Sequence, residues 1–195
     1  MREILLQIEQ LNKDNFDNFI VLLSRCGESN KLRSLNPPLI SRLKEDAFLL
    51  NPKYEAYLGK IGLDWVAYAI IVMSYSTFRA LPDLSIEEIC VLGDYRNLGI
   101  GAAMLKLCIR KAKKRGCGKI NLAVPVGNKK SKNFFEFNGA VQADDVSYQI
   151  DPDASQIRQP AGKPTYADFL RKKNTKKLPR LNYVGLDISQ QGERC

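Results

Sequence analysis

The chain has 195 residues, a net charge of +9 and 45% hydrophobic residues, enough for one domain of ordinary size plus a modest extension. It contains no histidine, which excludes Ser-His-Asp and Cys-His catalysis and metal binding through imidazole. No uncharged apolar run reaches the roughly 18–20 residues of a membrane-spanning helix, and charged residues interrupt the N-terminus where an export signal would be apolar.

The cysteines are odd in number and form no CxxC pair; they are Cys26, Cys90, Cys108, Cys117 and Cys195. This pattern favours free thiols in a reducing compartment over a disulfide framework or a zinc site. The sequence therefore predicts a soluble cytoplasmic protein with no bound metal and no membrane contact.

The first half of the chain alternates short strands and helices. Residues 2–8 are typical of a strand, Asn12 is placed to cap a helix that ends at Gly27, and Asn36 starts a second helix. Strands rich in β-branched and aromatic residues follow at 54–61, 65–75 and 84–92.

In the second half, the pattern predicts a helix from Gly99 to about Arg115, a strand at 119–126 and a helix from Gly127 to about Asn138. A strand–helix–strand order implies that 84–92 and 119–126 are parallel, with a right-handed crossover. A last strand candidate lies at 147–150. The fold class expected is α+β with a mixed sheet flanked by helices.

The end of the chain has a different composition. Residues 151–180 are rich in proline and basic residues, and 181–188 have the composition of an edge strand. We therefore expect one domain over 1–150 and a basic C-terminal extension over 151–195.

The positive charge is concentrated in one stretch. Every charged residue from Lys106 to Lys132 is basic, whereas the part of the chain before 106 has an excess of acids. This distribution suits an anionic cofactor beside a neutral or cationic second substrate. The alternative is a set of solvated helix faces.

A glycine-rich turn, Arg96-Asn97-Leu98-Gly99-Ile100-Gly101, joins the 84–92 strand to the following helix. Glycines let backbone N–H groups approach a ligand closely, and the first N–H groups of a helix are unpaired and lie at its positive end. The turn is therefore suited to hold a pyrophosphate. It is neither a Walker loop nor a dinucleotide fingerprint.

Two segments together resemble the acetyl-CoA site of the GNAT superfamily of N-acyltransferases. Tyr95 to Gly101 is similar to the superfamily's pyrophosphate signature, and Asn128 to Ala140 is similar to its second conserved helix. The resemblance covers about 53–150 well. Within the superfamily the best match is the diamine (spermidine/spermine and thialysine) acetyltransferase group, whose Leu-Glu-Asp strand corresponds to Ile86-Glu87-Glu88, and whose later helix matches at Asn128, Ser131, Asn133 and Phe134.

The resemblance implies where acetyl-CoA would bind. The sheet would splay between the 84–92 and 119–126 strands, and the backbone of Ile89, Cys90 and Val91 would pair with the pantetheine arm. The pyrophosphate would lie on the turn that ends in Gly101 and Ala102. Further contacts with the cofactor would come from the second helix, at Asn128, Ser131 and Phe135. Lys129 and Lys132 would either meet the phosphates of the cofactor or form a solvated helix start.

Acyl transfer to an amine needs a base, because an amine of pKa ~10 is mostly protonated at neutral pH. Glu87 is the first candidate, since it matches a glutamate of the diamine group, and Glu88 is the second. Strand alternation would place their side chains on opposite faces, so that at most one faces the thioester. The alternative is a structural ion pair.

The sequence departs from the family at Phe135, where a tyrosine is thought to protonate the leaving thiolate. The thiolate, of pKa near roughly 8.5, can leave unassisted; Tyr148, Tyr95 or Cys90 can take over; or the protein binds acyl-CoA without catalysis. A Cys90 acyl-enzyme is disfavoured, because no histidine lowers the pKa of its thiol.

The function predicted from these observations is transfer of an acetyl group from acetyl-CoA to a small amine or polyamine by direct attack. The alternatives are acetylation of a protein or aminoacyl-tRNA amine, and a non-catalytic acyl-CoA sensor. Nucleic-acid binding is disfavoured, because no recognised module is present. A homodimer is an assembly that the resemblance allows.

Overall fold

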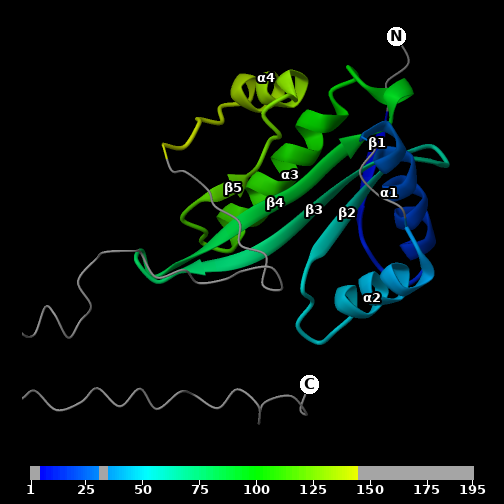
Figure 1. Cartoon of the computed structure of the whole chain (residues 1–195), viewed down its shortest axis with the longest axis horizontal. Coiled ribbons are helices and arrows are strands. Elements are labelled where there is room, and N and C mark those ends of the chain that lie inside the picture. Colours follow the sequence, from blue (N-terminus) through cyan, green and yellow to red (C-terminus); the bar gives the residue numbers. More distant parts are fainter. Residues whose placement is uncertain (1–4, 31–34, 145–195) are drawn as a thin grey trace, which may run out of the picture. The chain divides into compact units, whose positions relative to one another are not determined.

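The computed structural model describes residues 5–30 and 35–144. Within them, five strands form one sheet in the order β1-β2-β3-β4-β5 (Figure 1). The first four strands are antiparallel. Strand β4 pairs with β5 in parallel, as the strand–helix–strand order predicted. The strands are β1 (Leu6–Gln10), β2 (Glu55–Ile61), β3 (Asp64–Ser76), β4 (Leu81–Val91) and β5 (Ile120–Leu122).

Helices cover both faces of the sheet, which confirms the α+β prediction (Figure 1). The helices α1 and α2 pack on one face, and α3 and α4 pack on the other. The bounds are α1 (Phe16–Asn30), α2 (Pro37–Ala47), α3 (Ile100–Lys114) and α4 (Lys129–Phe137), and the 3-10 turn η1 (Gly93–Tyr95) precedes α3.

Amphipathic spacing explains how these helices pack. On α3, Ile100, Met104 and Cys108 are buried at helical spacing, while Lys106 and Arg110 are exposed. On α1, Phe16, Phe19, Leu22, Leu23 and Cys26 are buried against the opposite face of the sheet.

Strand β1 ends at Gln10 rather than at residue 8, and two further strands, β4 and β5, differ clearly from their predicted bounds. Strand β4 begins at Leu81 rather than 84, because the chain reverses just before it, where Ala80 adopts a positive φ of 52°. Strand β5 is three residues long rather than eight, and Pro125 lacks the N–H that a longer strand would need for pairing.

The β4–β5 ladder is short and lies at one end of β4. Leu84 to Ile86 pair with Ile120 to Leu122, and the remainder of β4, to Val91, pairs with β3 alone within the described residues. The pairing of β4 with β5 therefore ends after Ile86, between the two strands where the resemblance implied a splay.

The expectation of free cysteines is wrong for Cys26 and Cys90, which form a disulfide with a Cα–Cα distance of 6.5 Å. The positions of the two cysteines in the sequence, 64 residues apart, gave no sign that α1 and β4 bring these buried side chains together. Cys108 and Cys117 are free.

No helix among the described residues is long and apolar enough to cross a membrane. The chain divides into two units, Met1–Gln142 and Ala143–Cys195, and nearly all of the second lies outside the described residues. The predicted strands at 147–150 and 181–188, the extension over 151–195 and Tyr148 lie outside the described residues.

Candidate active site

Strand β4 contains a β-bulge at Glu87. Its neighbour Glu88 pairs with Ile70 and Ile86 pairs with Ile71, which leaves Glu87 as one extra residue opposite β3. A bulge breaks strict alternation and re-aims side chains, and both carboxylates line the same pocket. The expectation that the two side chains lie on opposite faces assumed an uninterrupted ladder, which the bulge interrupts; which of them faces the thioester stays a prediction.

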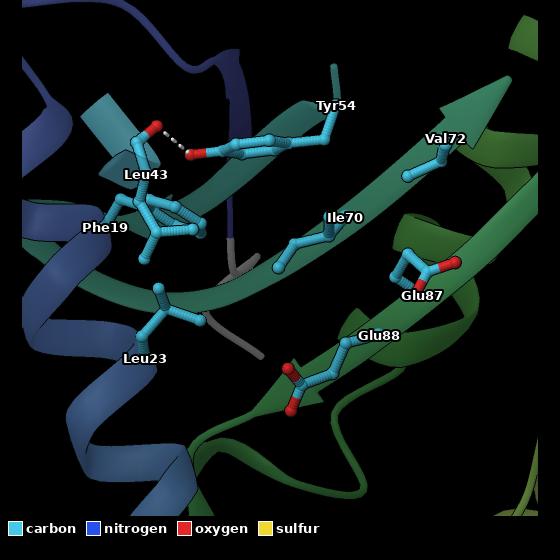
Figure 2. Close-up of a pocket in the computed structure, with 8 residues that line it drawn as sticks. All are labelled: Phe19, Leu23, Leu43, Tyr54, Ile70, Val72, Glu87 and Glu88. Carbon is cyan, nitrogen blue, oxygen red and sulfur yellow. Dashed lines mark hydrogen bonds between the residues drawn. The ribbon is translucent and has the colours of Figure 1, made fainter. Parts of the chain in front are cut away.

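The pocket has a volume of ≈ 230 Å³ and lies between β3, β4 and the two N-terminal helices. Figure 2 shows the carboxylates of Glu87 and Glu88 on one side and apolar side chains on the other. The phenol of Tyr54 donates to the carbonyl of Leu43 at 2.8 Å, which fixes the ring in the wall. The lining residues are Phe19, Leu23, Leu43, Tyr54, Ile70, Val72, Glu87 and Glu88.

Neither Glu87 nor Glu88 has a hydrogen bond or an ion pair with another residue of the described part of the chain. Glu87 is exposed and Glu88 is half-buried, and two neighbouring negative charges repel each other. The structural ion pair considered for Glu87 is thus not formed with any described residue. The pocket is suited to an organic cation, whose charge would lie near the two carboxylates and whose carbon chain would lie against the apolar wall.

The open edge of β4 lies next to this pocket. The N–H of Leu92 donates to the carbonyl of Val66 on β3 at 2.9 Å. Because the intervening peptide is trans, the Val91 carbonyl points away from β3, where it accepts a hydrogen bond from Arg96 Nε at 2.9 Å. By alternation the backbone of Ile89 faces the same open edge, and that of Cys90 faces β3.

The glycine-rich turn forms the entry to α3. Gly99 is the N-cap residue, with a left-handed φ of 80°, and no side chain caps the helix. Asn97 also has a positive φ, of 64°, and Leu98 is exposed. The first N–H groups of α3 are therefore free of a capping side chain, and Ile100 is buried and anchors the helix below them.

Helix α4 approaches the start of α3 at Gly101. A Cβ at that position would lie 3.4 Å from the ring of Phe134 and 3.8 Å from Val91, so the glycine permits this close packing. Asn128 caps α4 by accepting a hydrogen bond from the Ser131 N–H at 3.1 Å. The two segments that resemble an acetyl-CoA site are thus neighbours in space.

The position of the missing tyrosine is occupied by Phe135, which packs edge to face on Phe134 with ring centroids 5.0 Å apart. Two of the residues considered as replacement donors are engaged elsewhere. The Tyr95 hydroxyl donates to Asp64 at 3.0 Å, a hydrogen bond that raises the pKa of Tyr95, and Cys90 has no thiol proton because it is in the disulfide.

The apolar wall of the pocket was not among the site residues predicted from the sequence. Phe19 and Leu23 have the helical spacing of ordinary core residues, so nothing in the sequence marks them as lining a site.

A family model for the acetyltransferase (GNAT) family matches residues 18–140. The chain is a GNAT acetyltransferase. Members of this family use acetyl-CoA as the acetyl donor, and the chain is accordingly an acetyl-CoA-dependent N-acetyltransferase.

Curated relatives of this acetyltransferase include the thialysine N-epsilon-acetyltransferases of Mus musculus and Bos taurus. The mouse protein is 27% identical over 142 residues, which cover 69% of this chain and 83% of the relative. The bovine protein is 27% identical over 141 residues, covering 68% and 82%.

Solved structures support the fold of the acetyltransferase. A ribosomal-protein-alanine N-acetyltransferase from Brucella melitensis biovar Abortus 2308 superposes with a TM-score of 0.62 at 22% identity, covering 75% of this chain and 99% of that one. An aminoglycoside N-acetyltransferase solved in complex with CoA gives a TM-score of 0.65 at 16% identity, covering 77% and 97%.

Proposed function

We propose that this acetyltransferase moves the acetyl group of acetyl-CoA onto a small cationic amine held against Glu87 and Glu88. The supporting observation is the pair of unpartnered carboxylates on the bulge of β4, in an apolar-lined pocket beside the open strand edge. The names of the curated relatives point the same way, because thialysine carries a primary amine on a short chain.

The described residues fit acetyl-CoA, which supplies an acetyl thioester and a thiol leaving group when bound. The uncapped N–H groups of α3 after Gly99 would hold the pyrophosphate. The edge groups of Ile89 and Val91 would pair with the pantetheine arm, and Asn128 and Ser131 would contact the far side of the cofactor.

The carboxylates have separate roles in this proposal. Glu87 takes a proton from the bound ammonium, which frees the lone pair of the nitrogen for attack. Glu88, which is half-buried and nearer to α1, holds the cation and orients it. Phe135 offers no proton, so the thiol sulfur departs as a thiolate and is protonated afterwards.

The test is thiol release from acetyl-CoA across a panel of small amines, with Glu87→Gln, Glu88→Gln and the exposed Glu136→Gln as a matched control. We expect Glu87→Gln to lower kcat by about 100-fold or more, Glu88→Gln mainly to raise the KM for the amine, and Glu136→Gln to change neither. Acetyl-CoA binding without turnover of any amine would favour a sensor, and a steep loss of macromolecule binding with salt would favour a larger acceptor.

A further inference from the structure

The Cys26–Cys90 disulfide lies at one end of the amine pocket and joins its two walls. Cys26 follows the lining residue Leu23 by three positions on α1, so both lie on the same helix face. Cys90 follows the lining residue Glu88 by two positions on β4, so both lie on the same strand face. The bond thus connects the apolar wall to the acidic wall.

Helix α1 is otherwise held against the sheet largely by apolar packing, through Phe16, Phe19, Leu22 and Leu23. Apolar burial is non-directional, and it tolerates a small shift of a helix along the sheet. The disulfide is directional and fixes the two backbones 6.5 Å apart at this point. It therefore sets the separation of α1 from β4, and with it the width of the pocket.

We propose that Cys26 and Cys90 are positioning residues whose disulfide holds α1 at the distance from β4 at which the amine pocket is formed. The catalytic readout of this inference rests on the proposed function. Without the bond, α1 samples positions in which the apolar wall is displaced from the acidic wall. The apparent affinity for the amine is then the intrinsic affinity multiplied by the fraction of molecules in which the pocket is formed. The acetyl-CoA half, on the α3 and α4 side, keeps its packing.

A dithiol reagent breaks the bond by exchange. One thiolate of the reagent attacks the sulfur of Cys90, and Cys26 leaves as a thiolate that takes a proton from water. The second thiol of the reagent then closes a disulfide within the reagent and releases Cys90, so two electrons and two protons pass to the protein. Both cysteines are buried, at 1% and 8% exposure, and alkylation followed by mass spectrometry must verify the reduction.

The experiment compares oxidised and dithiol-reduced protein by three measurements: the KM for the amine, the affinity for acetyl-CoA by calorimetry, and amide hydrogen exchange along α1. If about a tenth of the reduced molecules keep the competent arrangement, the KM for the amine rises about tenfold. We expect the affinity for acetyl-CoA to stay within about twofold, and exchange around Phe19 and Leu23 to accelerate.

Two variants serve as controls. Cys117→Ser removes a free cysteine and should respond to the dithiol like the wild type. The Cys26→Ala/Cys90→Ala protein should behave like the reduced wild type and show no response to the dithiol.

The proposal is overturned if the isolated protein lacks the disulfide, if verified reduction changes neither the amine KM nor the exchange along α1, or if affinity for acetyl-CoA falls as much as affinity for the amine. A protein that turns over no amine contradicts the proposed function. In that case the hydrogen exchange and the calorimetry still decide whether the disulfide positions α1.

Discussion

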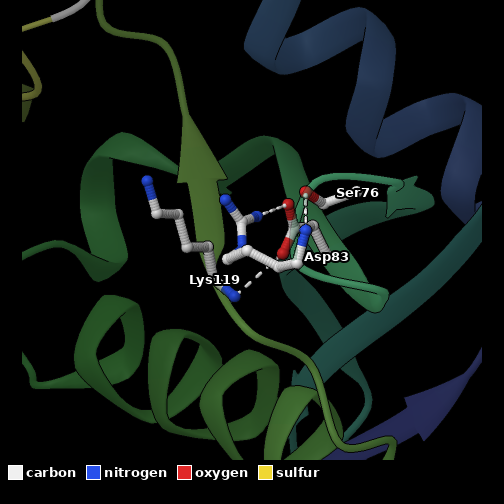
Figure 3. Close-up of polar contacts among 4 residues, drawn as sticks. Ser76, Asp83 and Lys119 are labelled. Carbon is white, nitrogen blue, oxygen red and sulfur yellow. Dashed lines mark hydrogen bonds and ion pairs between the residues drawn. The ribbon is translucent and has the colours of Figure 1, made fainter.

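The carboxylate of Asp83 accepts a hydrogen bond at 2.9 Å from the backbone N–H of Lys119, which lies 36 residues further along the chain. Asp83 is buried and also pairs with Arg79 from the β3–β4 turn, and Figure 3 shows Ser76, Asp83 and Lys119 gathered at this point. The adjacent Leu84 N–H donates to the Lys119 carbonyl at 3.1 Å. Asp83 thus fixes where β5 joins β4, and therefore where the sheet begins to splay.

Asp83→Ala should lower the free energy of unfolding by about 2–3 kcal/mol, because the Lys119 N–H and the partly buried Arg79 guanidinium lose their acceptor. Asp83→Asn keeps an acceptor without the charge and should cost roughly half as much. Urea unfolding measures both. Ser76→Ala, which removes a single long hydrogen bond of 3.3 Å within the turn, is the control; an equal loss there would show that Asp83 has no special role.

Phe135→Tyr should raise kcat, because it introduces a hydroxyl at the position where the related family carries a proton donor for the departing thiolate. A donor that was not tuned for this site should give roughly a tenfold increase at most. Steady-state thiol release measures it. Phe137→Tyr on the exposed side of α4 should leave kcat unchanged. A Phe135→Tyr protein of normal thermal stability with unchanged kcat would mean that position 135 does not face the sulfur.

Gly99→Ala should weaken acetyl-CoA binding, because a left-handed backbone costs an alanine about 1–2 kcal/mol and the turn must shift to relieve that strain. Gly99→Asn should be milder, since asparagine tolerates this conformation. Gly116, which has a φ of +66° beyond the other end of α3, provides the matched control. Gly116→Ala should cost similar stability and leave the calorimetric affinity for acetyl-CoA intact, and equal losses of affinity would contradict a local role for the turn.

Glu55 on β2 should make the free energy of unfolding depend on pH in the acidic range. Burial acts to raise the pKa of Glu55, but hydrogen bonds from Arg115 and Tyr57 and the nearby positive charge outweigh it and hold the pKa below the ordinary 4.5. The Arg115 contact is 2.7 Å long. A lowered native pKa gives stability that is present above the unfolded value and is lost as pH falls through the native pKa.

Glu55→Gln should therefore lower the free energy of unfolding by about 1–2 kcal/mol at pH 7, and the difference from the wild type should shrink below about pH 4.5. Denaturant unfolding across pH 3 to 7 follows this change. Glu45→Gln, at an exposed glutamate of α2, should track the wild type throughout. A difference that persists unchanged at pH 3 would rule out the ionised Glu55 as its source.

Local patterns were sufficient to predict the elements that dominate the sheet and the cofactor turn. The prediction of a helix from Gly99 to about Arg115 agrees with α3, because helix spacing and glycine at helix ends are encoded within a few residues. The parallel pairing of β4 with β5 followed from connection rules.

The acceptor side of the site could not be predicted in the same way. The bulge at Glu87 depends on how β4 is registered against β3, and that register is a property of two strands together. The disulfide and the apolar wall depend on α1 crossing β4 in space, so neither Cys26 nor Phe19 differs locally from an ordinary core residue. Long-range packing decided each of these points.

The short β4–β5 ladder also has a consequence for how the protein behaves in concentrated solution. Beyond Ile86 the edge of β4 presents backbone groups at Ile89 and Val91 that no strand among the described residues covers. Such an edge is a template for another chain. We therefore expect the protein to self-associate more readily without acetyl-CoA, and light scattering to show that adding the substrate reduces this association. Acetyl-CoA would then protect the enzyme from self-association in addition to serving as its substrate.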